Sequence, residues 1–286
     1  MIRVYTVSRK KLQSGDILSS NTLNNLSNKV DWLWIDASDL DKKETKIIST
    51  FFGIEEKIFN EITKGKIFPC CERYRDCVLI SIPSIEFEKA LQVHPISVII
   101  KEKMLITLRN ECDTRLIGKV VETLGGYMVE NGEVHPSFVV NRLFREIADQ
   151  NSEAMMSLRE LIDEVEEKAL AKPWDKSVTR SVFRLKKEIS TLHRLLWVEK
   201  ELMSDVKEHV IPYVELDEEA RLILGDAIDD IERELEFVDS YGRALDGILR
   251  LQDLGLIHRV ERNLIYLTAV ILLLTIISII LSIILK

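Results

Sequence analysis

The sequence has few of the residues that mark redox, metal or catalytic chemistry. It contains four cysteines, Cys70, Cys71, Cys77 and Cys112, and none belongs to a CxxC pair. This spacing does not fit a zinc site and suits a reducing compartment, so we interpret the cysteines as small core or surface residues. No nucleophile–His–acid order, phosphate-binding loop or HExxH pattern occurs, and the five histidines are scattered. We therefore expect that the chain is not an enzyme.

An excess of positive charge is also missing. The formal net charge is −8. A general nucleic-acid surface needs an excess of Lys and Arg, so we expect no nucleic-acid partner. An acidic protein can attract cations, although many ordinary cytoplasmic proteins are equally acidic.

A long run close to the end of the chain contains no charged residue. The 22 residues from Leu264 to Leu285 contain no charged residue, no Gly and no Pro. As a helix this run covers ~33 Å, against ~30 Å for the hydrocarbon core of a bilayer. A signal peptide would lie at the N-terminus, and a buried core helix, the remaining alternative, is rarely so long. The pattern predicts a transmembrane helix over residues 263–286, in contact with the lipid bilayer.

Positive residues flank this span mainly on one side. Arg250, His258, Arg259 and Arg262 precede it, and only Lys286 follows. Because positive residues stay on the cytoplasmic side, we expect a cell-membrane protein whose N-terminal bulk is cytoplasmic.

The first third of the chain alternates strand and helix patterns. Strands are expected at residues 3–7, 32–36, 77–82, 96–100 and 104–108, the last two as a hairpin. Helical patterns cover residues 40–52, 55–64 and 113–124, the last ending before Gly125-Gly126. We predict an α+β cytoplasmic domain over residues 1–134, built from a mixed sheet with helices.

From Pro136 onward the strand pattern disappears. A helical pattern runs to Ala171, Pro173 interrupts it, and a second runs to about His209, which predicts an antiparallel helical hairpin over residues 135–210. No Pro occurs from Tyr213 to the end. We therefore expect one helix of ~70 residues, ~105 Å long, with a cytoplasmic stalk over 211–262 and the transmembrane part over 263–286.

The stalk carries apolar residues at heptad spacing. This seam comprises Leu224, Ile228, Ile231, Leu235, Val238, Gly242, Leu245 and Leu249. A helix of this length is not stable on its own seam, so we expect a homo-oligomer in which copies bundle along it.

Small polar residues form a stripe within the span. Thr268, Thr275, Ser278 and Ser282 are spaced by 7, 3 and 4 residues and share one face. They could line a central axis that holds water or ions, or they could hydrogen-bond between packed membrane helices. Spacing alone does not decide between these two interpretations.

Two stalk carboxylates lie on the side away from the seam. Asp226 and Asp229 are three residues apart and could bind a hard cation together with oxygens of another domain. The alternative is a solvated charged face, partly neutralised by Arg233.

The order of these parts, and four local stretches, resemble the CorA-type magnesium transport proteins. WIDASDLDKKE resembles the family's Trp-Ile-Asp strand, and FPCCERYRDCVLISI its Pro-x-x-Glu-x-Tyr-x-Asp stretch. SVFRLKKEISTLHRLL resembles the Arg-rich second hairpin helix, and HVIPY the turn before the stalk. The resemblance covers essentially the whole chain. It implies an oligomeric funnel, a pentamer if the family holds, that carries Mg²⁺, Co²⁺ or another divalent cation.

The resemblance also implies roles for individual residues. Asp226 falls on a stalk aspartate that binds regulatory magnesium between subunits, and Asp229 on a second acidic position. Glu86 or Glu88 would supply the partner carboxylate. The pore-lining positions would be Leu264, Leu267, Ile271, Thr275, Ser278 and Ser282.

The chain departs from the family pattern at the membrane. The family's Gly-Met-Asn signature should begin at Leu285, but this sequence ends at Lys286, so it contains neither the signature nor the family's second span. Near the membrane entry, Arg250 and Glu261 stand where the family often has Asp and Asn. A natural single-span chain and a truncated form both remain open. We therefore expect an oligomeric divalent-cation channel gated by cation binding between cytoplasmic domains. The alternative is a non-conducting single-span relative that acts as a membrane-anchored cation sensor or assembly subunit.

Overall fold

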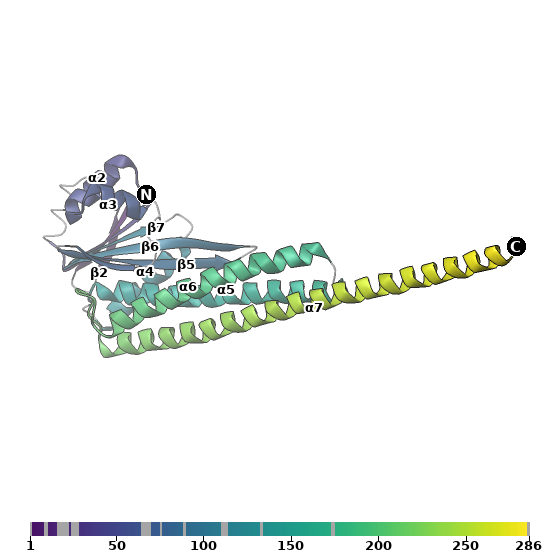
Figure 1. The fold of residues 1–286 in the computed structure, drawn as a ribbon. Helices are drawn as coiled ribbons and strands as arrows, with labels where there is room; N and C mark the ends of the chain where they lie inside the picture. Colours follow the sequence, from purple (N-terminus) through teal and green to yellow (C-terminus); the bar gives the residue numbers. More distant parts are fainter. Residues whose placement is uncertain are drawn as a thin grey trace. The chain divides into compact units, whose positions relative to one another are not determined.

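A computed structural model of the chain describes residues 2–8, 11–15, 23, 29–63, 70–74, 76–87, 90–109, 114–131, 134–172 and 175–284. These residues form a β-sheet with short helices, followed by three long helices (Figure 1). The chain divides into two compact units, one of Met1–Leu158 with Thr191–Val238 and one of Arg159–Ser190 with Asp239–Lys286. Each unit is described by itself.

The first unit contains a seven-stranded mixed sheet in the order β2-β1-β3-β7-β6-β5-β4. Strands β3 and β7 pair in parallel, and the other neighbouring strands pair antiparallel. The predicted mixed sheet and the hairpin of β6 and β7 are confirmed. The sequence patterns missed the two edge strands, β2 and β4. The strands are β1 (Ile2–Ser8), β2 (Lys11–Gly15), β3 (Trp32–Ser38), β4 (Cys70–Tyr74), β5 (Cys77–Phe87), β6 (Leu91–Lys101) and β7 (Met104–Arg109).

Three shorter helices accompany the sheet: α2 (Lys42–Phe52), α3 (Glu56–Thr63) and α4 (Thr114–Asn131). Helix α2 begins at a capping box, in which Asp41 and Glu44 satisfy each other's backbone N–H groups, and it ends at Gly53 with φ of 71°. The expectation that α4 ends before Gly125-Gly126 is wrong. A glycine costs a helix only ~1 kcal/mol, and α4 buries Val120, Leu124 and Met128 on either side of the pair.

A buried ion pair ties the two parallel strands together. Asp36 of β3 and Arg109 of β7 are 3% and 5% exposed. Arg109 donates from Nε to Asp36 Oδ1 at 3.0 Å and from Nη2 to Oδ2 at 2.9 Å. The Thr107 hydroxyl donates to Asp36 Oδ1 at 2.8 Å, and Trp34 Nε1 donates to Thr107 at 3.2 Å. This chain of bonds satisfies the carboxylate and fixes the alignment of β3 with β7.

The long helices are α5 (Ser137–Ala171), α6 (Lys176–Lys207) and α7 (Glu218–Ile284). All three helices were predicted from the sequence. The breaks between them lie near residues 172–175 and 208–217, close to the predicted ends at Ala171 and His209. Helix α7 runs for 67 residues and continues through Gly242 and Gly255. The predicted single helix from the stalk into the apolar run is therefore confirmed.

The buried line along α7 differs from the predicted seam. In the first unit Leu224, Ile231 and Val238 are buried as expected, but Glu234 is buried where Leu235 was predicted. In the second unit the buried position is Ile248 and not Leu249. A straight helix with 3.6 residues per turn drifts away from a 3.5-residue repeat, which accounts for the shift. Because these side chains are buried within one chain, the seam does not by itself require further copies.

The far part of α7 has the opposite character. From Leu256 onward, every side chain of α7 that the structure describes is exposed. In the described part of the chain, α7 is the one helix long and apolar enough to cross a membrane.

Replacing Asp36 by Ala is expected to destabilise the protein by about 3–5 kcal/mol, because Arg109 would keep a buried charge without its partner. Thermal unfolding of the full-length chain in detergent measures this loss. The control is Glu122→Ala, an exposed glutamate on α4. Equal melting temperatures for the two variants would contradict a structural role for the ion pair.

Candidate functional site

Asp226 and Asp229 lie on the exposed side of α7, as their spacing predicted. Both side chains are exposed, whereas Ala227 and Ile228 between them are buried. Among the described residues, no group of three or more His, Cys, Asp or Glu side chains is placed to hold a metal ion. Two outward carboxylates suit a hard cation only if further oxygens come from elsewhere, such as a second copy.

Glu86, the predicted partner carboxylate, lies at the end of β5 beside a cavity of about 270 Å³. Gln150 of α5 donates to Glu86 Oε1 at 3.3 Å and accepts from Ser84 at 3.3 Å. Neither Asp226 nor Asp229 is among the residues lining this cavity. A single chain therefore does not bring the predicted carboxylates together. Glu88 lies outside the described residues.

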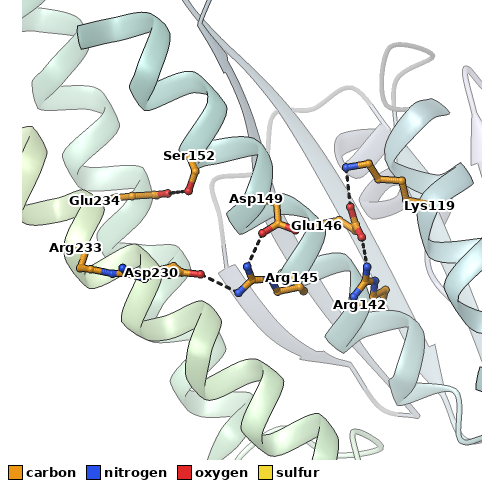
Figure 2. A network of polar contacts seen from close by, with 9 residues as sticks. All are labelled: Lys119, Arg142, Arg145, Glu146, Asp149, Ser152, Asp230, Arg233 and Glu234. Atoms are coloured by element: carbon orange, nitrogen blue, oxygen red, sulfur yellow. Dashed lines mark hydrogen bonds and ion pairs between the residues drawn. The ribbon is translucent and has the colours of Figure 1, made fainter.

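The same cavity is also lined by Glu146, whose carboxylate forms two ion pairs. Glu146 of α5 is 3% exposed and accepts from Arg142 at 2.6 Å. Lys119 of α4 pairs with its other oxygen at 3.1 Å (Figure 2). This three-residue network links α4 to α5, and its two cations outnumber its one carboxylate.

A second network joins α5 to α7 (Figure 2). Arg145 donates from Nη1 to Asp230 at 2.8 Å and from Nη2 to Asp149 at 2.6 Å, and Arg233 pairs with Asp230. Burial lowers the pKa of Arg145, but the two carboxylates outweigh burial and raise it. Asp230 is thus bound within the chain, and Asp226 and Asp229 lie outside this network.

Two further carboxyl groups are buried between the long helices of the first unit. Glu234 of α7 is 4% exposed and accepts from the Ser152 hydroxyl at 2.6 Å (Figure 2). Burial raises its pKa to about 7, and Asp230 and Asp149 add to the effect. Glu199 of α6 is 0% exposed and accepts from the Asn151 amide at 2.8 Å. Burial raises the pKa of Glu199 well above its ordinary value, and the charge of Glu234 adds to it.

Sequence reasoning missed both buried glutamates because a charged residue is normally expected on the surface. For Glu234 a signal was available. It stands three residues after Ile231 and four before Val238, both buried, which is a core position of the helix.

The predicted polar stripe of the span lies on α7. Thr268 Oγ1 donates to the Leu264 carbonyl at 2.8 Å, and Thr275 Oγ1 donates to the Ile271 carbonyl at 2.8 Å. Each hydroxyl proton is therefore used inside the helix, while the oxygen keeps its capacity to accept. Of the other predicted positions, Leu264, Leu267, Ile271 and Ser278 are exposed. Ser282 belongs to α7, but its side chain lies outside the described part.

Comparison with known proteins identifies this arrangement. A family model for the CorA-like Mg²⁺ transporter protein matches residues 29–284. The chain belongs to this family. CorA-like proteins are transporters, so the expectation that the chain is not an enzyme is confirmed, as is the expected membrane protein with an N-terminal soluble domain.

A curated relative carries the same family name. The cobalt/magnesium transport protein CorA of Methanocaldococcus jannaschii is 24% identical over 183 residues, which is 63% of this chain. The match spans 56% of that protein's length, little more than half.

Solved structures share the CorA-like fold. The complete CorA magnesium transporter of M. jannaschii aligns with a TM-score of 0.73 and 20% identity, covering 92% of this chain and 79% of that one. The soluble domain of the same protein aligns with a TM-score of 0.68 and 19% identity, covering 87% and 96%. The full-length CmaX protein aligns with a TM-score of 0.71 and 14% identity, covering 94% and 81%. These structures confirm the predicted α+β domain followed by a long C-terminal helix.

The buried Glu234 makes stability depend on pH. Its pKa is 4.5 ordinarily and about 7 in the folded chain. The stability that the protonated carboxyl contributes is therefore present below about pH 4.5 and is lost as the pH rises to about 7, by up to ~3 kcal/mol. Melting temperatures of full-length protein in detergent and chelator, across this range, measure the loss. Glu234→Gln should flatten the dependence and the exposed control Glu236→Gln should not, so identical pH profiles for both variants would contradict the assignment.

Proposed function

We propose that the chain is a CorA-like divalent-cation transport protein, with Mg²⁺ as its principal cargo, whose copies arrange α7 around a membrane pore. Family membership supports the class of cargo. The stripe of threonines on an otherwise apolar, exposed helix is the observation that carries the pore.

The threonine hydroxyls suit a hydrated cation. Mg²⁺ dehydrates reluctantly and keeps several of its waters, whose hydrogens point away from the ion. A wall that guides such an ion must therefore accept hydrogen bonds rather than donate them. Thr268 and Thr275 meet this requirement, because their protons bond to carbonyls of their own helix and their oxygens remain acceptors.

The positive residues before the span support its orientation. Arg250, His258, Arg259 and Arg262 are exposed on α7 just ahead of the apolar run. By the positive-inside rule, the sheet domain (1–134), the helical hairpin (135–210) and the stalk (211–262) are cytoplasmic, and residues 263–286 span the cell membrane.

The outward carboxylates of α7 support gating by the cation between subunits. In a ring of copies, five if it follows the family, Asp226 and Asp229 of one chain face a neighbour, whose Glu86 and Glu88 are the candidate partners. A bound Mg²⁺ holds the two surfaces together. When it leaves, the carboxylates repel and the population shifts toward a looser, open ring.

Replacing Thr275 by Leu or by the isosteric Val should lower Mg²⁺ flux by about tenfold, because hydrogen bonds to a charged hydration shell are worth ~1.5 kcal/mol or more. Uptake of Mg²⁺ or Co²⁺ into proteoliposomes reconstituted with the full-length chain measures the flux. The matched control is Ile276→Val, one residue away and off the stripe.

The wild-type chain itself decides between the two functions. Flux no higher than in empty vesicles, under any cation gradient, would overturn the transport proposal. If cation binding then persisted, the result would favour the alternative of a non-conducting, membrane-anchored sensor or assembly subunit.

The double variant Asp226→Asn, Asp229→Asn is expected to remove the Mg²⁺ dependence of assembly. Mass photometry of the detergent-solubilised protein, with and without millimolar Mg²⁺, measures the oligomer fraction. The exposed control Glu236→Gln should assemble with Mg²⁺ as the wild type does. An unchanged response of the Asp variant would refute the site assignment in both candidate functions.

A further inference from the structure

Three helices of the first unit converge on a buried polar cluster that the transport proposal does not use. Helix α5 contributes Asn151 and Ser152, α6 contributes Glu199 and α7 contributes Glu234. Asn151 bonds to Glu199 and Ser152 to Glu234, and the two glutamates interact electrostatically. Adjacent residues of α5 thus hold one carboxyl group each, which brings both into a single layer of the helices.

Three oxygens of this cluster are buried without a partner among the described residues. They are Glu199 Oε1, Glu234 Oε2 and Asn151 Oδ1, on side chains that are 0%, 4% and 1% exposed. A buried acceptor left unsatisfied costs about 1–3 kcal/mol, and more when it carries charge. With both glutamates ionised all three are acceptors, so what satisfies them must be a donor of hydrogen bonds or a positive ion.

Three positive side chains of the same helices are already engaged in ion pairs. Lys200 pairs with Glu232 at 2.7 Å, and Arg145 with Asp149 and Asp230. Arg233 lowers the pKa of Glu234, but it is 67% exposed and pairs with Asp230. Burying two carboxylates without compensation is strongly unfavourable, so the pair requires either protons or a cation.

We propose that Glu199, Glu234 and Asn151 form a binding site for one hard divalent cation inside the helical bundle of each chain. Two carboxylates and an amide oxygen are ligands that Mg²⁺ and Ca²⁺ accept, and a divalent ion neutralises both charges. This site differs from the proposed contact at Asp226 and Asp229, because its ligands are buried and come from one chain. It does not depend on transport.

The raised pKa values of both glutamates agree with this site. Without the cation, protons neutralise the pair at low pH. At pH 8 a cation would take their place, so its stabilising effect should be larger there than at pH 5.

The test uses the full-length chain in detergent, in the Asp226→Asn, Asp229→Asn background, which removes the proposed site between subunits. Melting temperatures are measured at pH 5 and pH 8 in chelator, and then with Mg²⁺ or Ca²⁺ alone. A cation at about 100 times its Kd should raise the melting temperature at pH 8 by roughly 5 °C or more. Equilibrium dialysis of the same samples should find one bound cation per chain.

Isosteric variants identify the ligands. Adding Glu199→Gln and Glu234→Gln should abolish both the shift and the bound cation, whereas Glu201→Gln with Glu236→Gln, exposed residues on the same two helices, should preserve them. The proposal fails if the Gln pair retains the cation. It also fails if alkaline pH destabilises the protein with no response to either cation, which would show a cluster that binds protons only. Absence of flux in vesicles would leave this result untouched.

Discussion

The structure depends on the continuity of α7. Its 67 residues extend for about 100 Å without a break, and isolated helices gain too little from backbone bonding to persist in water. The early part is stabilised by burying Leu224, Ile231 and Val238 within the chain. The late part is apolar and exposed on all sides, so its stability must come from lipid or from other copies. The early part of α7 thus packs within the chain in water, whereas the late part is suited to lipid. The change from one environment to the other marks the membrane boundary.

The sequence predicted those elements whose signal lies in a short, regular pattern. The core strands β3, β5, β6 and β7 are apolar runs bounded by polar residues, and the long helices are delimited by proline-containing turns. The sequence patterns missed edge strands β2 and β4 because neither strand buries a side chain and each pairs with only one neighbour. The predicted end of α4 was wrong because the pair Gly125-Gly126 was interpreted as the end of the helix. Burial of Leu124 and Met128 on either side overrides the cost of two glycines.

The exposed residues of the candidate site could be predicted from helical periodicity, but their contacts within the chain could not. The exposed face of Asp226 and Asp229 follows from helical periodicity, and the threonine stripe from the same rule. The intrachain partners could not be predicted, because Arg145 lies 85 residues from Asp230 and only the packing of α5 against α7 brings them together. Glu199 and Glu234 were missed since their burial contradicts the usual distribution of charge. Such exceptions are expected at positions where function, rather than stability, selects the residue.

The hydrogen bonds of the span bear on the choice between pore and interhelical contact, which spacing left open. Cross-helix hydrogen bonding needs a donor on one helix for each acceptor on the next. Between Leu264 and Leu281 the sequence offers as side-chain donors only the hydroxyls of Tyr266, Thr268, Thr275 and Ser278. The hydroxyls of Thr268 and Thr275 donate to carbonyls of their own helix, so two of these four donors are already engaged. Identical helices packed together would therefore present more acceptors than donors along the stripe. Our transport proposal assigns the role of donor to water and hydrated cations on a central axis.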